Sequence, residues 1–339
     1  MTKKTVRDID LAGKKVLVRV DYNVPVKDGV VGDTLRIQAS FETINYLLDQ
    51  DCSVVLMSHL GRPDGKPDNK YTLKEVAAKA AELLGRPIEF LSDCIGDDVK
   101  SKVNGMKSGD IVLLENLRFH AEEEANDDGF AKQLADLGEV YVDDAFAAIH
   151  RAHASTVGVT KYLPAVAGLL VEKEVDTLTS AMEKPDRPMV AIIAGAKIST
   201  KIEVLDNLLA KVDSLVIGGA MANTFLAGQG HPVGKSLVEA DQIETAKRVM
   251  GDSITKGVEL FLPEDVVVSK KADAAEEVRT ITLGQVTDDD IIVDVGPESV
   301  EQVNIEIDAA KTVIWNGPLG ITEVPEFAKA SIEVAKHLA

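Results

Sequence analysis

The sequence predicts an α/β protein with two domains, each built on a doubly wound parallel sheet of the Rossmann-like kind. Short runs rich in β-branched residues alternate with amphipathic helical patterns along the chain, as in sheets that carry helices on both faces. The chain has 339 residues, and this length fits two domains at roughly 150 residues each. A long helical pattern separates the alternating elements into two series.

The first series begins with the apolar stretch KVLVRV, which predicts a buried strand. The expected strands cover residues 15–20, 53–58, 110–114 and 139–142, and the expected helices cover residues 34–49, 72–84 and 129–137. Thr72 and Glu75 have the spacing of a capping box, and Gly85 lies just past the end of the same helical pattern. The alternation predicts a first parallel sheet.

The second series follows a long helical pattern at residues 163–183 and a turn at residues 185–188. The expected strands cover residues 189–194, 215–217, 259–262, 291–293 and 312–315, and expected helices include residues 201–210 and 240–254. We place the domain junction on the long helix. The predicted organisation is a first domain at residues 1–168, an interdomain helix and hinge at 169–187, and a second domain at 188–339.

Composition and charge exclude several classes of protein. Lys and Arg number 37 and Asp and Glu number 56, so the net charge is −19, and such a surface repels nucleic acid and anionic membranes. No apolar run reaches the roughly 18 residues that span a bilayer, and the N-terminal sequence has no apolar stretch like that of a signal peptide. Cys52 and Cys94 are too few and too isolated for a disulfide framework or a zinc site. We therefore expect a cytoplasmic protein without nucleic-acid or membrane partners.

Cationic and polar residues follow the expected strands of the first series, and the ends of parallel strands meet at one edge of a sheet. The candidates are Asp21, Asn23, Arg36, His59, Arg62, Arg118 and Arg151, together with Arg19, His150 and His153. In a protein of charge −19, their convergence predicts a site for a small anion with several negative charges. The alternative is that each arginine pairs with a surface acid and each histidine makes a structural hydrogen bond.

The second series has glycines and lysines after its strands. Gly195 and Gly219 allow close backbone approach to a phosphate, and Lys197 and Lys201 would lie on one face of a helix that starts here. The segment WNGPLG, with Asn316 and Pro318, closes a later strand and precedes Glu323. In the alternative interpretation, Gly195 only relieves a tight turn between strand and helix, and the two lysines are solvated. The segment WNGPLG would then be a rigid buried turn around its tryptophan.

Two nucleotide-binding motifs are excluded. GKS at residues 234–236 resembles the end of a P-loop, but Gln229 stands where the leading glycine would be required. No GxGxxG follows a strand, so the dinucleotide fingerprint is absent.

Taken together, the segments RVDYNVP, SHLGRP, LLENLRF, HRAHAS, YLPAVAG, GAKISTK, DNLL and WNGPLG resemble phosphoglycerate kinases, in order and along the whole chain. The resemblance implies a monomeric two-domain hinge enzyme of glycolysis. Such an enzyme transfers a phosphoryl group reversibly between 1,3-bisphosphoglycerate and ADP, giving 3-phosphoglycerate and ATP, with Mg²⁺ bound to the nucleotide. It places the phosphoglycerate on the first domain and the nucleotide on the second.

The resemblance also implies roles for the candidates. Arg36 and Lys197 would be catalytic, and Asp21, Asn23, Arg36, His59, Arg62, Arg118 and Arg151 would hold the phosphoglycerate. The nucleotide would contact Gly195, Lys201, Gly219, Asn316, Pro318 and Glu323, and no side chain is expected to be a resident metal ligand. Departures from the family pattern stand at Asp143, Ala147, Ala220, Asn223 and Thr322. They bear on adenine binding rather than on the identity of the substrate.

One departure concerns the end of the chain. Members of the family continue past the helical pattern at residues 327–338 into another strand and a GGGD turn that binds the Mg-nucleotide, whereas this sequence ends at Ala339. We therefore expect a nucleotide-binding domain that is incomplete at its C-terminus. Two alternatives stay open, a fragment that binds phosphoglycerate only and an NAD-dependent dehydrogenase.

Overall fold

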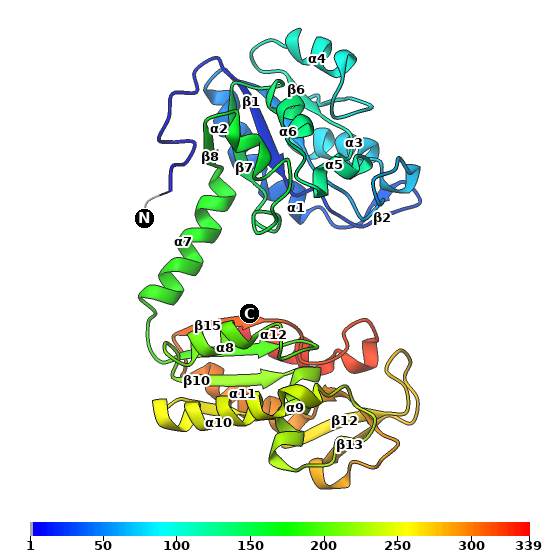
Figure 1. Ribbon diagram of the computed structural model, residues 1–339, viewed down its shortest axis with the longest axis vertical. Helices are drawn as coiled ribbons and strands as arrows, with labels where there is room; N and C mark the ends of the chain where they lie inside the picture. Colours follow the sequence, from blue (N-terminus) through cyan, green and yellow to red (C-terminus); the bar gives the residue numbers. More distant parts are fainter. Residues whose placement is uncertain (1–2) are drawn as a thin grey trace. The chain divides into compact units, whose positions relative to one another are not determined.

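The computed structural model describes residues 3–339. The chain forms two compact units, and the boundary between them lies between Leu178 and Thr179, within helix α7 (Leu169–Glu183). Each unit contains a parallel sheet with helices on both faces (Figure 1). Among the described residues, no helix is both long enough and apolar enough to cross a membrane.

The N-terminal unit is built on a six-stranded parallel sheet in the order β5-β6-β4-β1-β7-β8. The strands are β1 (Lys15–Val20), β4 (Ser53–Met57), β5 (Glu89–Phe90), β6 (Ile111–Leu113), β7 (Val140–Asp144) and β8 (Ala165–Ala167). All residues of β4 and β6 are buried, because helices cover both faces of the sheet. This double burial explains why the strands read as continuous apolar runs. A small hairpin, β2 (Val26–Lys27) and β3 (Val30–Val31), follows β1.

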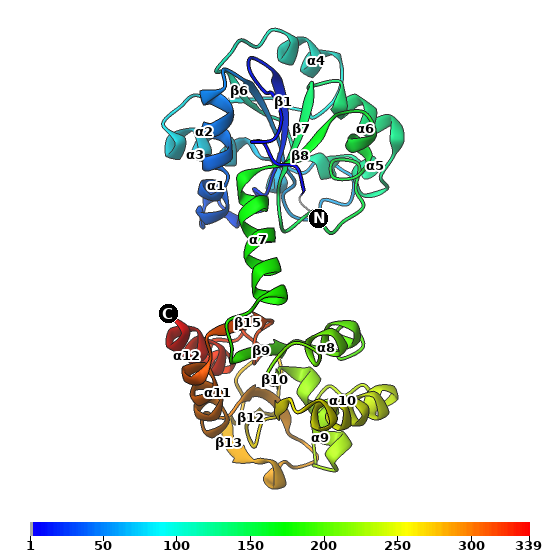
Figure 2. The ribbon, with the colours of Figure 1, turned by 90° about the vertical axis from the view of Figure 1, so that its left-hand side faces the viewer.

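Figure 2 shows the two helical layers of this unit. One layer contains α1 (Leu35–Ala39), α2 (Phe41–Asp49) and α3 (Lys74–Leu84). The other contains α4 (Asp97–Asn104), α5 (Ala121–Glu124) and α6 (Asp128–Ala135). Each layer packs its apolar face on one side of the sheet and forms its own core, with Ile44 and Leu47 in the first and Phe130 and Leu134 in the second.

Three local predictions in this unit need correction. The helix expected at 34–49 is interrupted at Ser40, whose hydroxyl donates to the carbonyl of Ile37 (2.8 Å). The capping box at Thr72 does not form. Instead, Glu115, which follows β6, accepts hydrogen bonds from the Thr72 hydroxyl (2.6 Å) and the Leu73 amide (2.8 Å). A distant carboxylate therefore replaces the local cap, while Gly85 does end α3 in the left-handed conformation (φ 69°).

The third correction concerns the long helix expected at 163–183. Its first part is strand β8, which pairs with β7, and the helix begins only at Leu169. Asp144 at the end of β7 accepts hydrogen bonds from the amides of Leu170 (3.0 Å) and Val171 (3.4 Å), and so satisfies the first turn of the helix. A Cβ at position 168 would stand 2.1 Å from Oδ1 of Asp144, so only glycine fits there.

The C-terminal unit contains a four-stranded parallel sheet in the order β11-β10-β9-β15. Its strands are β9 (Met189–Ala194), β10 (Ser214–Gly218), β11 (Glu259–Phe261) and β15 (Thr312–Asn316). Helices α8 (Ile202–Leu208), α9 (Ala220–Gln229) and α10 (Ile243–Lys256) cover one face, and α11 (Pro297–Ala309) and α12 (Lys329–Leu338) cover the other (Figure 2).

A second, antiparallel sheet in this unit was not expected from the sequence. It consists of β12 (Asp265–Ser269), β13 (Arg279–Thr282) and β14 (Ile291–Val295) in the order β13-β12-β14. The expectation that residues 291–293 join the parallel sheet is therefore wrong. The described residues also include short 3₁₀ helices at Asn69–Tyr71, Leu117–Phe119, Gly158–Lys161, Ala240–Gln242, Leu283–Gln285 and Pro325–Phe327.

Candidate functional site

Four neighbouring strands of the N-terminal sheet end beside one another, and the predicted anion-binding residues follow their ends. In the order β6-β4-β1-β7, the segments after these strands contain Arg118, then His59 and Arg62, then Asp21 and Asn23, then Arg151. Arg36 lies on α1, the first helix after β1. The parallel register therefore brings segments from distant parts of the sequence to one edge of the sheet.

A chain of hydrogen bonds connects several of these residues. Nη1 of Arg36 donates to Oδ2 of Asp21 (2.8 Å) and to the carbonyl of Asn23 (3.3 Å). Oδ1 of Asn23 accepts from the amide of Gly61 (2.9 Å), and Nη1 of Arg118 donates to the Gly61 carbonyl (2.9 Å). The loops after β1, β4 and β6 are thus held in one fixed arrangement.

Arg19 differs from the sequence expectation, which placed it after the first strand with the anion-binding candidates. It lies within β1, is 1% exposed, and donates to Oγ of Ser155 (3.0 Å), the Val20 carbonyl (2.5 Å) and Nδ1 of His59 (2.9 Å). Ser155 in turn donates to Oε1 of Glu123 (2.6 Å). Arg19 therefore positions His59 and the loop after β7 from inside the protein.

The local field at this edge is strongly positive. Burial, followed by the charges of Arg19, Arg118 and Arg151, holds the pKa of His59 far below its ordinary value. The pKa of Arg118 is also lowered, by burial and by neighbouring arginines, although Glu124 opposes this effect. The positive potential therefore disfavours the protonated, cationic form of a group at this edge and would stabilise a bound anion.

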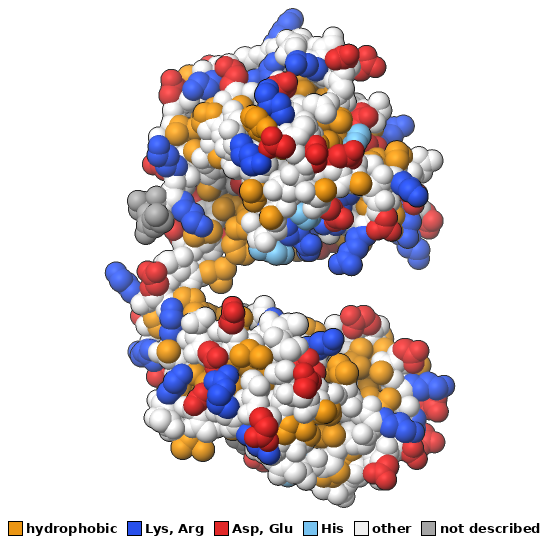
Figure 3. Space-filling model, in the orientation of Figure 1, with side chains coloured by type: hydrophobic (Ala, Val, Ile, Leu, Met, Phe, Trp, Pro, Cys, Tyr) orange, Lys and Arg blue, Asp and Glu red, His pale blue; other side chains and the backbone are white. Residues whose placement is uncertain are grey.

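The alternative that the arginines merely pair with acids applies to some of them only. Arg36 pairs with Asp21 and Arg118 with Glu124. Within residues 3–339, Arg62 and Arg151 are exposed and make no ion pair with an acidic side chain. Figure 3 shows histidine side chains beside lysine and arginine side chains on the surface of this unit. Two guanidinium groups are therefore available to a ligand.

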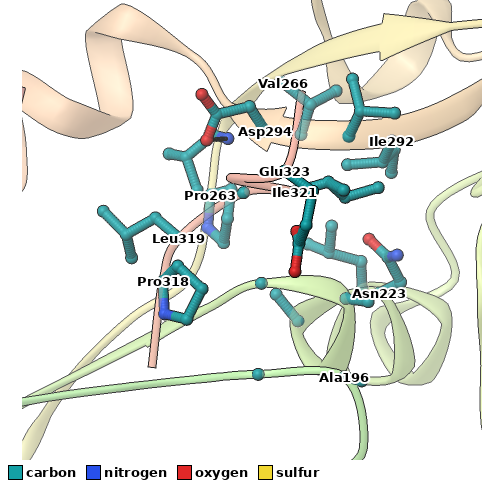
Figure 4. A pocket seen from close by; sticks show the side chains of 18 residues that line it. Ala196, Asn223, Pro263, Val266, Ile292, Asp294, Pro318, Leu319, Ile321 and Glu323 are labelled. Atoms are coloured by element: carbon teal, nitrogen blue, oxygen red, sulfur yellow. Dashed lines mark hydrogen bonds between the residues drawn. The ribbon is translucent and has the colours of Figure 1, made fainter. Parts of the chain in front are cut away.

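The C-terminal unit contains a cavity of about 330 Å³ at the ends of β9, β10 and β15. Four of the six predicted nucleotide-binding residues line it, namely Gly195, Gly219, Pro318 and Glu323. In Figure 4 the carboxylate of Glu323 points into the middle of the cavity, with Pro318 on one side and Asn223 on the other. Much of the remaining lining is apolar, and it includes Leu226, Val266 and Ile292.

Backbone hydrogen bonds fix the loops that form the floor of this cavity. The amide of Gly219 donates to the carbonyl of Leu319 (3.0 Å), and the amide of Met221 donates to the carbonyl of Gly195 (2.9 Å). Gly219 has φ +66°, and a Cβ there would stand 2.6 Å from the backbone nitrogen of Gly195. Only glycine allows the loops after β9 and β10 to approach this closely.

The lysines after β9 are arranged differently from the prediction. Helix α8 begins at Ile202, so Lys197 and Lys201 lie in a turn rather than on one helical face. Ser199 anchors this turn to Glu239 through its amide (3.1 Å) and hydroxyl (2.5 Å). Nζ of Lys201 donates to Oδ1 of Asn316, which joins the segment after β9 to the end of β15, while Lys197 is exposed.

Sequence reasoning did not assign Asp294 to the cavity. Burial raises the pKa of this carboxyl to about 6, although the amides of Ala330 and Val295 donate to it. The bond to Ala330 (3.0 Å) holds the start of α12. No motif marks Asp294, because it lies in the antiparallel sheet that the apolar pattern did not predict.

One group of side chains in the described part of the chain has the spacing of metal ligands. Atoms of Asp93, Cys94 and His120 lie within 4.8 Å of one another. Burial raises the pKa of the Cys94 thiol well above its ordinary value, so the thiol stays protonated. Nε2 of His120 and Oδ1 of Asp93 share a hydrogen bond (2.7 Å). The group is explained as a structural hydrogen-bonded pair beside a buried thiol.

The comparisons with known proteins agree over almost the whole chain. The model of the family described as "Phosphoglycerate kinase" matches residues 6–339. The chain belongs to the phosphoglycerate kinase family. The phosphoglycerate kinase of Chloroherpeton thalassium is 52% identical over 340 residues, and that of Pelotomaculum thermopropionicum is 49% identical over 339 residues. Each alignment covers 100% of this chain and 86% of the relative.

Solved phosphoglycerate kinase structures have the same fold. The enzyme from Coxiella burnetii aligns with a TM-score of 0.81 and 36% identity, covering 99% of this chain and 85% of its own. The enzyme from Pyrococcus horikoshii aligns with a TM-score of 0.85 and 31% identity, covering 99% and 86%. The family makes the chain a phosphotransferase that uses phosphoglycerate and adenine nucleotide substrates. It excludes the dehydrogenase alternative, and no comparison favours a fragment that only binds phosphoglycerate.

Proposed function

We propose that the two clusters are the two substrate sites of one kinase reaction. The N-terminal unit would bind 3-phosphoglycerate or 1,3-bisphosphoglycerate, and the C-terminal unit would bind ADP or ATP. The observation that carries this proposal is the content of one edge of each parallel sheet. Arg62 and Arg151, which have no acidic partner among the described residues, lie at one edge of the first, and a cavity lined by glycines and apolar side chains lies at one edge of the second. The first suits a small anion and the second suits a nucleoside with its phosphates.

The N-terminal residues divide into direct contacts and supports. Arg62 and Arg151 would grip the phosphoglycerate directly, because neither is paired with an acidic side chain in the described structure. Arg118 and His59 contribute positive potential and a hydrogen-bond donor, and Asp21 and Asn23 hold Arg36 in place. Arg36 would neutralise the reacting carboxylate. Hydrogen bonds between charged groups each contribute roughly 1.5 to 3 kcal/mol.

In the C-terminal unit the glycines would let the nucleotide approach the backbone. Gly195 and Gly219 lie at the cavity floor, and Pro318 and Glu323 would contact the ribose side. Lys201 and Asn316, which are bonded to each other, would meet the phosphates. Lys197 is exposed in the same turn and would follow the phosphoryl group during transfer.

The chemistry needs positioning and charge rather than a nucleophilic side chain. Phosphoryl transfer proceeds with negative charge spread over the equatorial oxygens, and preorganised cations stabilise that charge. Arg36 and Lys197 are the residues we propose for this role. The Mg²⁺ ion would enter as part of the nucleotide substrate, since magnesium keeps several waters and binds through phosphates. The carboxylate of the acceptor supplies the attacking oxygen, so no general base is required.

We expect the protein to act as a monomer in the cytoplasm, as the resemblance to its family implies. We expect no nucleic-acid or membrane partners, because its net charge of −19 repels polyanions. The test of the whole proposal is a coupled assay of ATP formation from 1,3-bisphosphoglycerate and Mg-ADP. Separate titrations with 3-phosphoglycerate and with Mg-ADP accompany it. Turnover with saturation by both substrates is expected. Phosphoglycerate binding without any turnover would instead identify a binding-only protein.

A further inference from the structure

One buried acid, Glu123, contacts the loop that contains Arg151. It lies on α5 and is 1% exposed, so it is too deep to touch a ligand itself. A buried carboxylate loses its hydration, and hydrogen-bond donors must surround it to offset that loss. The donors to the carboxylate of Glu123 come from one segment, which is the loop after β7.

The side chain and the backbone of Glu123 together hold consecutive residues of this loop. Oε2 accepts from the amide of Ser155 (2.9 Å), and Oε1 accepts from the Ser155 hydroxyl (2.6 Å). The backbone carbonyl of Glu123 accepts from the amide of Ala154 (2.9 Å), and Nδ1 of His153 lies 3.7 Å from Oε1. Both carboxylate oxygens therefore bind the segment that starts two residues after Arg151.

A second set of hydrogen bonds joins this segment to Arg151. The hydroxyl of Thr156 donates to the carbonyl of Arg151 (2.6 Å) and accepts from the amide of His153 (3.1 Å). Thr156 directly follows Ser155, which is bound to Glu123. The backbone of Arg151 is therefore fixed relative to a buried anchor, while its side chain is exposed.

Glu123 also orders the hydrogen bonds that lead to His59. The Ser155 hydroxyl donates its single hydrogen to Glu123, so its oxygen uses a lone pair to accept from Nε of Arg19 (3.0 Å). Arg19 then donates to Nδ1 of His59 (2.9 Å). Two groups of the proposed phosphoglycerate site, Arg151 and His59, are thus connected to one buried acid by separate routes.

We propose that Glu123 is a positioning residue for phosphoglycerate, because it holds the loop after β7 in the arrangement that binds this substrate. This inference rests on the proposed phosphoglycerate site. A loop without its anchor has to be ordered when the ligand binds, and that cost lowers affinity. The anchor needs a carboxylate, since Glu123→Gln replaces one acceptor by a donor. If that donor meets the Ser155 amide, two donors face each other, and if it meets the hydroxyl, the hydroxyl loses its acceptor.

The test measures the affinity of Glu123→Gln for 3-phosphoglycerate and, separately, for Mg-ADP by calorimetric titration. We expect the dissociation constant for 3-phosphoglycerate to rise about tenfold and that for Mg-ADP to stay within about twofold. In the coupled assay the KM for 1,3-bisphosphoglycerate should rise while kcat stays within about twofold, because uniform binding is lost. Unchanged affinity for 3-phosphoglycerate would overturn the inference and leave the proposed function intact. Failure of the unmodified protein to bind 3-phosphoglycerate would overturn both.

The matched control is Asp265→Asn in the C-terminal unit. Asp265 is 3% exposed and also accepts from both the amide (2.8 Å) and the hydroxyl (2.6 Å) of one serine, Ser299. The control should lose stability, as Glu123→Gln does, but keep the 3-phosphoglycerate affinity of the unmodified protein. An equal loss of this affinity in both variants would mean that general destabilisation, and not the position of the loop, explains the effect.

Ser155→Ala tests the same contact with a smaller change and keeps the inference testable if Glu123→Gln does not fold. It should weaken 3-phosphoglycerate binding about three- to tenfold, and unchanged affinity would contradict the inference. In the double variant the loss should exceed that of the stronger single variant by no more than about twofold, because both changes break one contact. Losses that multiply would show that Glu123 does not act through Ser155.

Discussion

Nη2 of Arg19 lies 2.9 Å from Nδ1 of His59, and the direction of this hydrogen bond follows from the chemistry of the two groups. A guanidinium group only donates, so Nδ1 accepts and the proton of the neutral imidazole is on Nε2. The low pKa of His59, caused by burial and by Arg19, keeps the ring in this form. His59 is therefore a neutral donor near the arginines that we propose bind the phosphoglycerate.

Because His59 is neutral, we predict that it supports phosphoglycerate binding through its hydrogen bonds and not through a positive charge. His59→Gln keeps an acceptor for Arg19 and an N–H donor, so phosphoglycerate affinity should fall by no more than about threefold. His59→Leu removes both and should weaken binding at least about tenfold. The difference in affinity between the unmodified protein and His59→Gln should not change between about pH 5.5 and pH 8. A change through this range in calorimetric titrations would mean that His59 titrates normally.

The unpaired arginines should act on one substrate only. Arg62→Ala or Arg151→Ala should weaken phosphoglycerate binding by roughly 1.5 to 3 kcal/mol per lost charged contact and leave nucleotide affinity nearly unchanged. Calorimetric titrations of each variant with both ligands measure this. Arg248→Ala is the control, because Arg248 pairs with Asp206 and Asp252 in the C-terminal unit. Equal losses for both ligands would contradict the assignment of substrates to units.

Lys197 and Arg36 should affect the rate more than binding. If they stabilise charge that develops during transfer, alanine at either position should lower kcat by a factor on the order of 10² or more, with a smaller change in KM. Steady-state kinetics in the coupled assay provide both numbers. Lys247→Ala serves as the control, because Lys247 lies on α10 and pairs with Glu244. A normal kcat with a raised KM would make Lys197 and Arg36 ground-state binders.

The sequence predicted the strands that position the site better than the loops that form it. Strand β9 covers residues 189–194 as expected, because strands buried on both faces give continuous apolar runs. The segment from Gly195 to Lys201 was expected to be helical from the spacing of its lysines, but that spacing is equally compatible with a turn. The anchor of this turn, Glu239, is 40 residues away from Ser199. Local patterns contain no information about such a contact.

The same limit applies to the other corrections. Glu115 replaces the expected cap at Thr72 from a loop 43 residues away. Arg19 was expected among the residues that follow the first strand, but Ser155, 136 residues away, accepts a hydrogen bond from it inside the protein. The sequence could mark Asn223 as a departure from the family pattern. Only the structure shows that its oxygen is buried and has no hydrogen-bond partner among the described residues. Tertiary contacts, rather than propensities, decided these positions.

Gly219 allows the effect of a close backbone approach to be separated from that of backbone strain. Gly219→Ala and Gly257→Ala both place a side chain at positive φ, +66° and +69°, but only the first meets another atom within 4 Å. We expect Gly257→Ala to cost about 1 to 2 kcal/mol of stability without affecting nucleotide affinity. Gly219→Ala should cost more and weaken Mg-ADP binding strongly. Trp315, the single tryptophan, reports unfolding of the C-terminal unit by fluorescence. Unimpaired Mg-ADP binding by Gly219→Ala would contradict the placement of the nucleotide at this loop.

The N-terminal end of α7 is held by the carboxyl group of Asp144, and burial disfavours the ionised form of this group. Oδ1 of Asp144 accepts from Leu170 and Val171, while Oδ2 is buried without a partner in the described structure. Burial raises the pKa of Asp144 from 3.8 to about 6. Between these two values the folded state binds the proton more tightly than the unfolded state. Stability contributed by this group is therefore lost as the pH rises from about 4 to above 6.

Asp144→Asn should remove this loss, because its Oδ1 can keep both backbone bonds and its neutral amide takes the place of the unpartnered oxygen. The variant and the unmodified protein should have similar stability near pH 4, and the variant should become more stable as the pH rises to about 8. The rise in pKa sets an upper bound on the order of 3 kcal/mol. Urea unfolding followed by circular dichroism measures the N-terminal unit, while Trp315 fluorescence identifies the transition of the C-terminal unit. Asp64→Asn at an exposed position is the control and should show no such trend. If the stability difference between Asp144→Asn and the unmodified protein stayed constant from pH 4 to pH 8, Asp144 would not be the group whose ionisation weakens this unit.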